Sequence, residues 1–118
     1  MTLYLTALER AALEEICRRQ IDSRRVLESQ LATVAVASRE NSGAGFFTYL
    51  EVDRAAAPVA NAKRVLGNVA ASIEGFKQPL LLMLFMKDGY AEMLEGAAVD
   101  DSTLGVDLST LQFKIAPA

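Results

Sequence analysis

The chain of 118 residues has no histidine, no tryptophan and one cysteine. Without histidine it lacks the commonest general base near neutral pH, which excludes Ser-His and Cys-His nucleophile pairs and zinc sites that combine histidine with cysteine. The single cysteine, Cys17, cannot form an internal disulfide, and its place in an apolar helical pattern predicts a small buried side chain. We therefore expect neither a metal nor a cofactor.

Basic patches and long apolar runs are also scarce. The formal net charge is −3, and the one concentration of basic residues, within 18–25, lies in or beside a predicted helix. Because nucleic-acid binding normally needs a basic stripe, we expect no nucleic-acid partner. The apolar run 79–86 is far shorter than the roughly 20 residues of a membrane span, and residues 1–15 do not resemble a signal peptide. These features predict a cytoplasmic protein that contacts no membrane.

The segment 3–30 is predicted to be helical, because apolar residues recur there at intervals of three and four positions. Thr2 or Thr6 can cap the first helix, and Thr6 stands three residues before Glu9, the spacing of a capping box. A second, weaker helix is predicted for residues 22–30. One bent helix fits the pattern equally well.

The segment 33–116 changes to a period of two and is predicted to be rich in β-strands. "TVAVAS" and "FFTYLEV" flank the turn residues "NSGAG", which predicts a β-hairpin. A three-residue loop, with Asn41 paired to Gly45, gathers the branched and aromatic residues on one face, whereas a two-residue loop mixes them with polar positions. Because a buried face selects register, we prefer the three-residue loop, with Gly43 or Gly45 at positive φ.

A second hairpin is indicated by Asp88-Gly89, the strongest short signature of a two-residue turn. This turn pairs Lys87 with Tyr90, and a regular continuation pairs Phe85 with Glu92. The strand before the turn is apolar on both faces, so both faces should be covered. The helices can cover one face. A second sheet, a dimer partner or a ligand can cover the other.

Further strands are predicted near 64–74, where Gly67 marks a bulge, and near 113–115. A hydrophobic fraction of 52% is sufficient for one folded domain, 1–118. The predicted class is α+β, with one or two N-terminal helices packed on an antiparallel sheet of five or six strands built from hairpins.

Charged residues and glycines of the two hairpins are the candidates for chemistry. Backbone N–H groups of "SGAG" together with Arg39 could hold an anion, but a phosphate loop opens a helix and these glycines lead into a strand, so a plain hairpin is preferred. Glu92 and Glu95 are expected on opposite faces and cannot form a catalytic pair by themselves. A buried Glu95 would need a cation, for which Arg39 is the best candidate and Arg64 the alternative.

Two stretches, "SRENSGAGFFTYLEV" and "KDGYAEMLEG", together resemble a type of small bacterial protein in which S-R-E-x-[ST]-G-x-G-F-[FY]-T precedes D-G-[FY]-x-x-x-L-E-G. The matching positions are Ser38, Arg39, Glu40, Gly43, Gly45, Phe46, Phe47 and Thr48, then Asp88, Gly89, Tyr90, Leu94, Glu95 and Gly96. The function of such proteins is uncharacterised, so the resemblance implies a shared fold and no activity. It also implies that Arg39, Glu40 and Glu95 recur for a reason that hairpin geometry does not supply.

These observations favour a non-enzymatic binding or protein-interaction module, expected to be a homodimer, that uses the apolar sheet face or a rim near Arg39 and Glu95. Its partner can also be another, unidentified protein or a small anionic ligand. One alternative is a small hydrolase or isomerase with Glu40 or Glu95 as base and Arg39 as anion clamp. Another is an immunity-type protein whose acidic surface neutralises a basic partner. The predicted binding residues are Arg39, Glu40, Gly43, Gly45, Tyr90 and Glu95.

Overall fold

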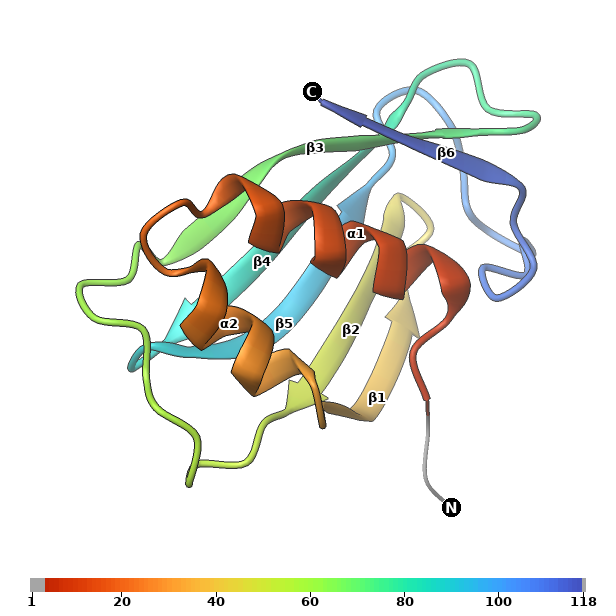
Figure 1. Cartoon of the computed structure of the whole chain (residues 1–118). Coiled ribbons are helices and arrows are strands. Elements are labelled where there is room, and N and C mark those ends of the chain that lie inside the picture. Colours follow the sequence, from red (N-terminus) through yellow and green to blue (C-terminus); the bar gives the residue numbers. More distant parts are fainter. Residues whose placement is uncertain (1–3, 118) are drawn as a thin grey trace.

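The computed structural model describes residues 4–117, which form two helices and a six-stranded antiparallel sheet (Figure 1). The helices are α1 (Ala7–Arg19) and α2 (Arg24–Leu31). The strands are β1 (Ala35–Asn41), β2 (Gly45–Glu51), β3 (Val65–Ile73), β4 (Leu80–Lys87), β5 (Tyr90–Ala97) and β6 (Phe113–Pro117), in the sheet order β1-β2-β5-β4-β3-β6. The predicted α+β class is confirmed, with two separate helices rather than one bent helix.

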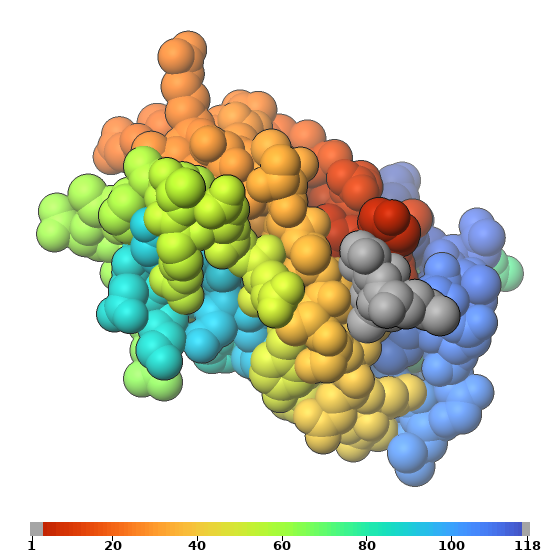
Figure 2. All heavy atoms as spheres, turned by 90° about the horizontal axis from the view of Figure 1, so that it is seen from below, coloured from red at the N-terminus to blue at the C-terminus, as the bar shows by residue number. Residues whose placement is uncertain are grey.

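Both helices pack on the same face of the sheet. α1 contacts β3, β4 and β6, and α2 contacts α1 and β5. Seen from below, the red and orange helical segments lie towards the top, and the yellow and cyan strands lie towards the bottom (Figure 2). We call the face under the helices the inner face and the opposite one the open face. Within residues 4–117, neither helix is long and apolar enough to cross a membrane.

α1 begins at the predicted capping box. The Glu9 N–H donates to the Thr6 hydroxyl at 3.1 Å, and the Thr6 N–H donates to the Glu9 carboxylate at 2.7 Å. Each bond satisfies a backbone donor that the first helical turn leaves without a partner. The apolar stripe of α1 then faces the sheet, and Cys17 lies within it at 2% exposure. This exposure confirms the predicted small buried side chain, and burial raises the pKa of the Cys17 thiol to about 12.

The turn at Asp88-Gly89 has the predicted geometry. The φ angles of Asp88 and Gly89 are 53° and 84°, and Lys87 pairs with Tyr90. Positive φ at both central residues is what a type I′ hairpin turn requires, because its twist then matches that of the two strands.

A bulge in β5 changes the register beyond this turn. Phe85 pairs with Met93, so the predicted pairing of Phe85 with Glu92 is wrong by one residue. An extra residue in one strand shifts every later pair, and short-range patterns do not reveal where it is inserted. The shift places Leu84 opposite Leu94, and both are fully buried on the inner face.

The first hairpin turns through Gly43-Ala44, so the predicted three-residue loop is wrong. Asn41 pairs with Phe46 rather than with Gly45, and the Ser42 N–H donates to the Gly45 carbonyl oxygen at 3.1 Å. The glycine expectation is confirmed at both positions, since φ is 85° at Gly43 and 131° at Gly45.

A bulge in β1 explains why the predicted apolar residues still share one face although the loop is shorter than predicted. The register shifts between Val36 and Ser38, so Val36 still pairs with Leu50, and both are buried as predicted. On the loop side of the bulge, Arg39 pairs with Thr48 and shares its inner face. With a three-residue loop and no bulge, Arg39 would have lain on the opposite face.

The other predicted strands are confirmed. The register between β3 and β4 shifts between Leu66 and Val69, and Asn68 has a φ of 67°, which is the bulge expected at Gly67. β6 pairs with β3 and completes the sheet on that edge.

Gly89 is required by its surroundings as well as by its φ angle. A Cβ there would lie 2.7 Å from the Val59 carbonyl oxygen, whereas a Cβ at Gly75, whose φ is 93°, would meet no atom within 4 Å. We expect Gly75→Ala to lower the free energy of unfolding by about 1–2 kcal/mol through positive φ alone, and Gly89→Ala to lower it further. Urea melts of both variants measure the difference. Equal losses would contradict the proposed clash with the segment around Val59.

Candidate functional site

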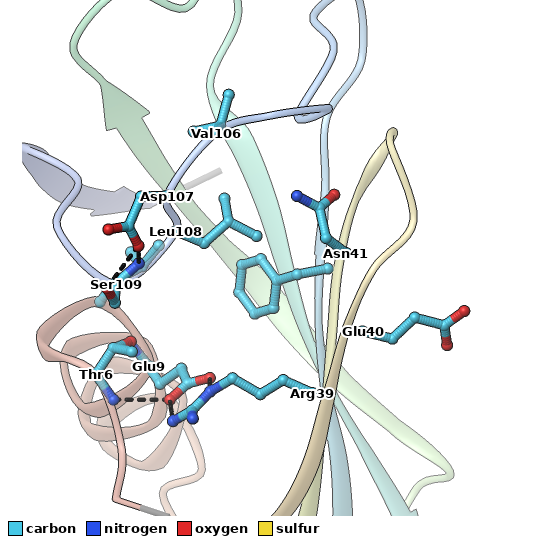
Figure 3. A pocket seen from close by; sticks show the side chains of 11 residues that line it. Thr6, Glu9, Arg39, Glu40, Asn41, Val106, Asp107, Leu108 and Ser109 are labelled. Carbon is cyan, nitrogen blue, oxygen red and sulfur yellow. Dashed lines mark hydrogen bonds and ion pairs between the residues drawn. The ribbon is translucent and has the colours of Figure 1, made fainter.

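Among the charged side chains of residues 4–117, that of Glu9 is the most completely buried, with an exposed fraction of 3%. Arg39 donates to both carboxylate oxygens, from Nε at 2.8 Å and from Nη2 at 2.7 Å, and also donates to the Tyr4 carbonyl. The Thr48 hydroxyl donates to Oε2 at 2.5 Å, and the Thr6 N–H donates to Oε1 at 2.7 Å. Figure 3 shows Glu9 held between the start of α1 and the Arg39 side chain. We call Glu9, Arg39, Thr48 and Thr6 the Glu9 cluster.

The Glu9 cluster holds an ion pair. Burial by itself raises the pKa of Glu9, but the hydrogen bonds from Arg39, Thr48 and Thr6 together outweigh burial and lower that pKa below its ordinary value. The hydrogen bond to Glu9 raises the pKa of Arg39. Both side chains are therefore charged at neutral pH. A buried carboxylate that accepts four hydrogen bonds is a poor base, because its ionised form is already stabilised.

A cavity of about 260 Å³ opens beside the cluster, between the start of α1, the β1–β2 hairpin and the loop 106–109. Phe46 and Leu8 provide apolar walls, and Asp107 lies at the opposite side with its carboxylate bonded to Ser109 (Figure 3). Among the described residues, no buried side-chain nitrogen or oxygen lacks a hydrogen-bond partner. The positive charge of Arg39 is matched by Glu9, which disfavours a small anionic ligand at Arg39, one of the partners that the sequence left open.

Arg39 and Glu95 lie on opposite faces of the sheet, so the predicted pair between them is wrong. Arg39 shares the inner face with Thr48, while Glu95 pairs with Phe47 and Met83 on the open face. The bulge in β1 causes the difference, because one extra residue turns Arg39 to the other face. No cation within the described residues forms an ion pair with Glu95.

Glu40 pairs with Phe47 on the neighbouring strand and lies on the open face, and its side chain points away from the cavity in Figure 3. Glu40 and Glu95 therefore share a face with each other and not with Arg39. The arrangement required by the alternative enzyme, a carboxylate base beside an arginine clamp, is not formed by these three residues.

The remaining predicted binding residues hold backbone segments together. Gly45 allows β2 to approach β5, since a Cβ there would lie 1.8 Å from the Gly96 carbonyl oxygen. The Gly43 carbonyl accepts from the Thr103 N–H at 2.9 Å. The Tyr90 hydroxyl donates to the Ala56 carbonyl at 2.8 Å, which fixes the segment between β2 and β3. These contacts explain the residues structurally and give no ligand group.

The open face carries the apolar residues that the helices do not reach. Three of the rows that its outward-facing side chains form across the sheet are largely apolar. The rows are Tyr49, Met93, Phe85 and Val65; Phe47, Glu95 and Met83; and Ala97, Leu81 and Ala70. Tyr49, Val65 and Leu81 are 38–40% exposed, which is high for large apolar side chains within strands. We take this face as the candidate functional site.

Sequence reasoning placed Glu9 in the capping box but missed its burial. Its position carried a signal, because Glu9 lies four residues after Leu5 and four before Leu13, on the apolar side of α1. Gln30 was missed as well. Its amide donates to the Ala57 and Gly89 carbonyls at 3.0 and 2.8 Å and accepts from the Ala91 N–H at 3.0 Å. No local pattern indicated these long-range bonds.

We expect Arg39→Gln to lower the free energy of unfolding at pH 7 by about 3 kcal/mol, because the Glu9 carboxylate is then buried without its cation. This is the low end of the range for broken buried pairs, since Arg39 is partly exposed. Arg24→Gln, which breaks the exposed pair with Glu28, is the matched control and should cost less than about 0.5 kcal/mol. Urea melts compare the two. Losses of equal size would show that the ion pair of the Glu9 cluster stabilises the fold no more than an exposed ion pair does.

The lowered pKa of Glu9 also predicts how stability depends on pH. A carboxyl whose folded-state pKa lies below its ordinary value of 4.5 contributes stability that is complete above pH 4.5 and is lost as pH falls through the folded-state pKa. The stability difference between wild type and Glu9→Gln should therefore shrink as pH falls below 4.5. Glu14→Gln, on the exposed side of α1, should follow the wild-type profile. A constant difference down to pH 2 would contradict the ion pair.

Comparisons of the chain with protein-family models, with curated proteins and with solved structures found no match.

Proposed function

We propose that the chain is a non-enzymatic protein-interaction module whose binding surface is the open face of the sheet. The observation that carries this proposal is the set of largely apolar rows on β2, β5, β4 and β3, interrupted by Glu95, that neither described helix covers. Large contiguous apolar patches on a protein surface usually mark a binding site, because exposed apolar area costs about 25 cal/mol per Å².

The composition of the open face supports binding to protein. Phe47, Tyr49 and Phe85 are aromatic, and Met83 and Met93 are flexible apolar side chains beside them. Aromatic residues and methionine are enriched in the buried centres of protein interfaces, where lysine and glutamate are depleted. The apolar side chains occupy the middle strands of the sheet.

Neutralisation of a basic partner is a second candidate. One observation favours it: Glu40, Glu51 and Glu95 all project from one half of the open face, on β1, β2 and β5. Such a half would attract a basic surface and would raise the association rate at low salt. Strong salt dependence of binding to a basic protein, with little loss on replacing Leu81, would favour this candidate over apolar docking.

Methionine oxidation tests the proposed surface directly, because Met83 and Met93 lie on the open face while Met86 is buried in the core at 5% exposure. In dilute purified protein, peroxide should oxidise Met83 and Met93 faster than Met86. In intact cells that produce the chain, we expect Met83 and Met93 to be protected at least about fivefold relative to dilute protein. Met86 is the internal control for folding. Equal oxidation of Met83 and Met93 in cells and in dilution would rule out the open face as a binding surface.

A further inference from the structure

We infer that the partner on the open face is a second copy of the chain, packed sheet against sheet with the two-fold axis parallel to the strands. This inference rests on the proposed function and adds the identity of the partner. It follows from the size of the face and from the distribution of charge across it.

The flat footprint of the face is of the same order as, but smaller than, the area that a stable dimer buries on each partner. Six strands at a spacing of about 4.8 Å span about 24 Å, and strand segments of about six residues extend about 20 Å. The flat footprint is therefore about 500 Å², and projecting side chains make the accessible area larger. Stable interfaces bury about 800 Å² on each partner, and two sheets pack face to face at about 10 Å.

The outward charges are separated across the sheet. Glu40, Glu51 and Glu95 project from β1, β2 and β5, which form one half. Lys87 projects from β4 and Lys114 from β6, in the other half, because each alternates with inward residues of its strand. The middle of the face is apolar except for Glu95, which lies between Phe47 and Met83. One half of the open face is thus acidic and the other basic.

This separation selects one way of pairing two copies. A two-fold axis parallel to the strands places β1, β2 and β5 of one copy over β6, β3 and β4 of the other, so the acidic half meets the basic half twice. An axis across the strands would place β1 of one copy over β1 of the other, and β5 over β5. Glu40 would then approach Glu40 of the second copy, and Glu95 would approach Glu95. Like charges placed opposite one another disfavour the second arrangement.

Two charge-reversed variants test this geometry in sedimentation equilibrium. The first, Lys87→Glu with Lys114→Glu, makes both halves acidic, and the second, Glu40→Lys with Glu51→Lys and Glu95→Lys, makes both halves basic. We expect wild type to be a dimer at micromolar concentration, and each variant to dissociate with a Kd at least tenfold higher. An equimolar mixture of the two variants should form a heterodimer, because acidic and basic halves meet again.

A third variant, Leu81→Arg, places a charge at an exposed apolar position of β4 and should be a monomer. Its urea melt should match that of wild type diluted until the dimer has dissociated. Far-UV circular dichroism confirms that each variant is folded, and Leu81→Arg alone decides the outcome if a charge-reversed variant is not. Wild type that remains monomeric at 100 µM would overturn the second-copy inference. Protection of Met83 and Met93 in cells would then still support the proposed function with a different partner. A dimer that Leu81→Arg leaves intact would also overturn the inference, since it would use another surface.

Discussion

The arrangement of α1 and the first hairpin depends on the hydrogen bonds that the buried Glu9 carboxylate accepts. Its two oxygens accept hydrogen bonds from the start of α1, from β1 through Arg39 and from β2 through Thr48. Loss of any of these donors destabilises the fold, because an unpaired charge in the interior is strongly unfavourable. The cluster therefore fixes where the helix begins relative to the edge of the sheet.

A second constraint is the amount of helix. Two short helices cover one face of a six-stranded sheet, and the chain supplies no further layer within residues 4–117. β4 is nonetheless apolar on both sides, with Leu82 and Leu84 facing the helices and Leu81 and Met83 facing outward. The apolar surface on the open face is thus a consequence of the sequence of β4 and the small size of the helical layer. The proposal that this face binds another protein follows from that imbalance.

Three bulges give the sheet its final arrangement of side chains. Those in β1 and β5 each shift the register by one residue, and the one in β3 lies next to Gly67. Their combined effect is that Arg39 faces inward to meet Glu9, while Glu40 and Glu95 face outward. The candidate site depends on the same bulges, because they decide which charges border the open face.

The sequence by itself determined the fold class, the capping box, the type I′ turn at Asp88-Gly89 and the two-sided apolar character of β4. The last three are local properties, set by residue spacing within one helix, turn or strand, and the fold class follows from the order of such elements along the chain. Only the tertiary structure decided the loop length of the first hairpin, the partner of Arg39 and the burial of Glu9 and Gln30. A bulge is selected by the packing of both faces of a sheet at once, and a buried polar group by donors far away in the chain. Neither is written in a local pattern, so the residues of the open face could be recognised individually from the sequence but not placed together.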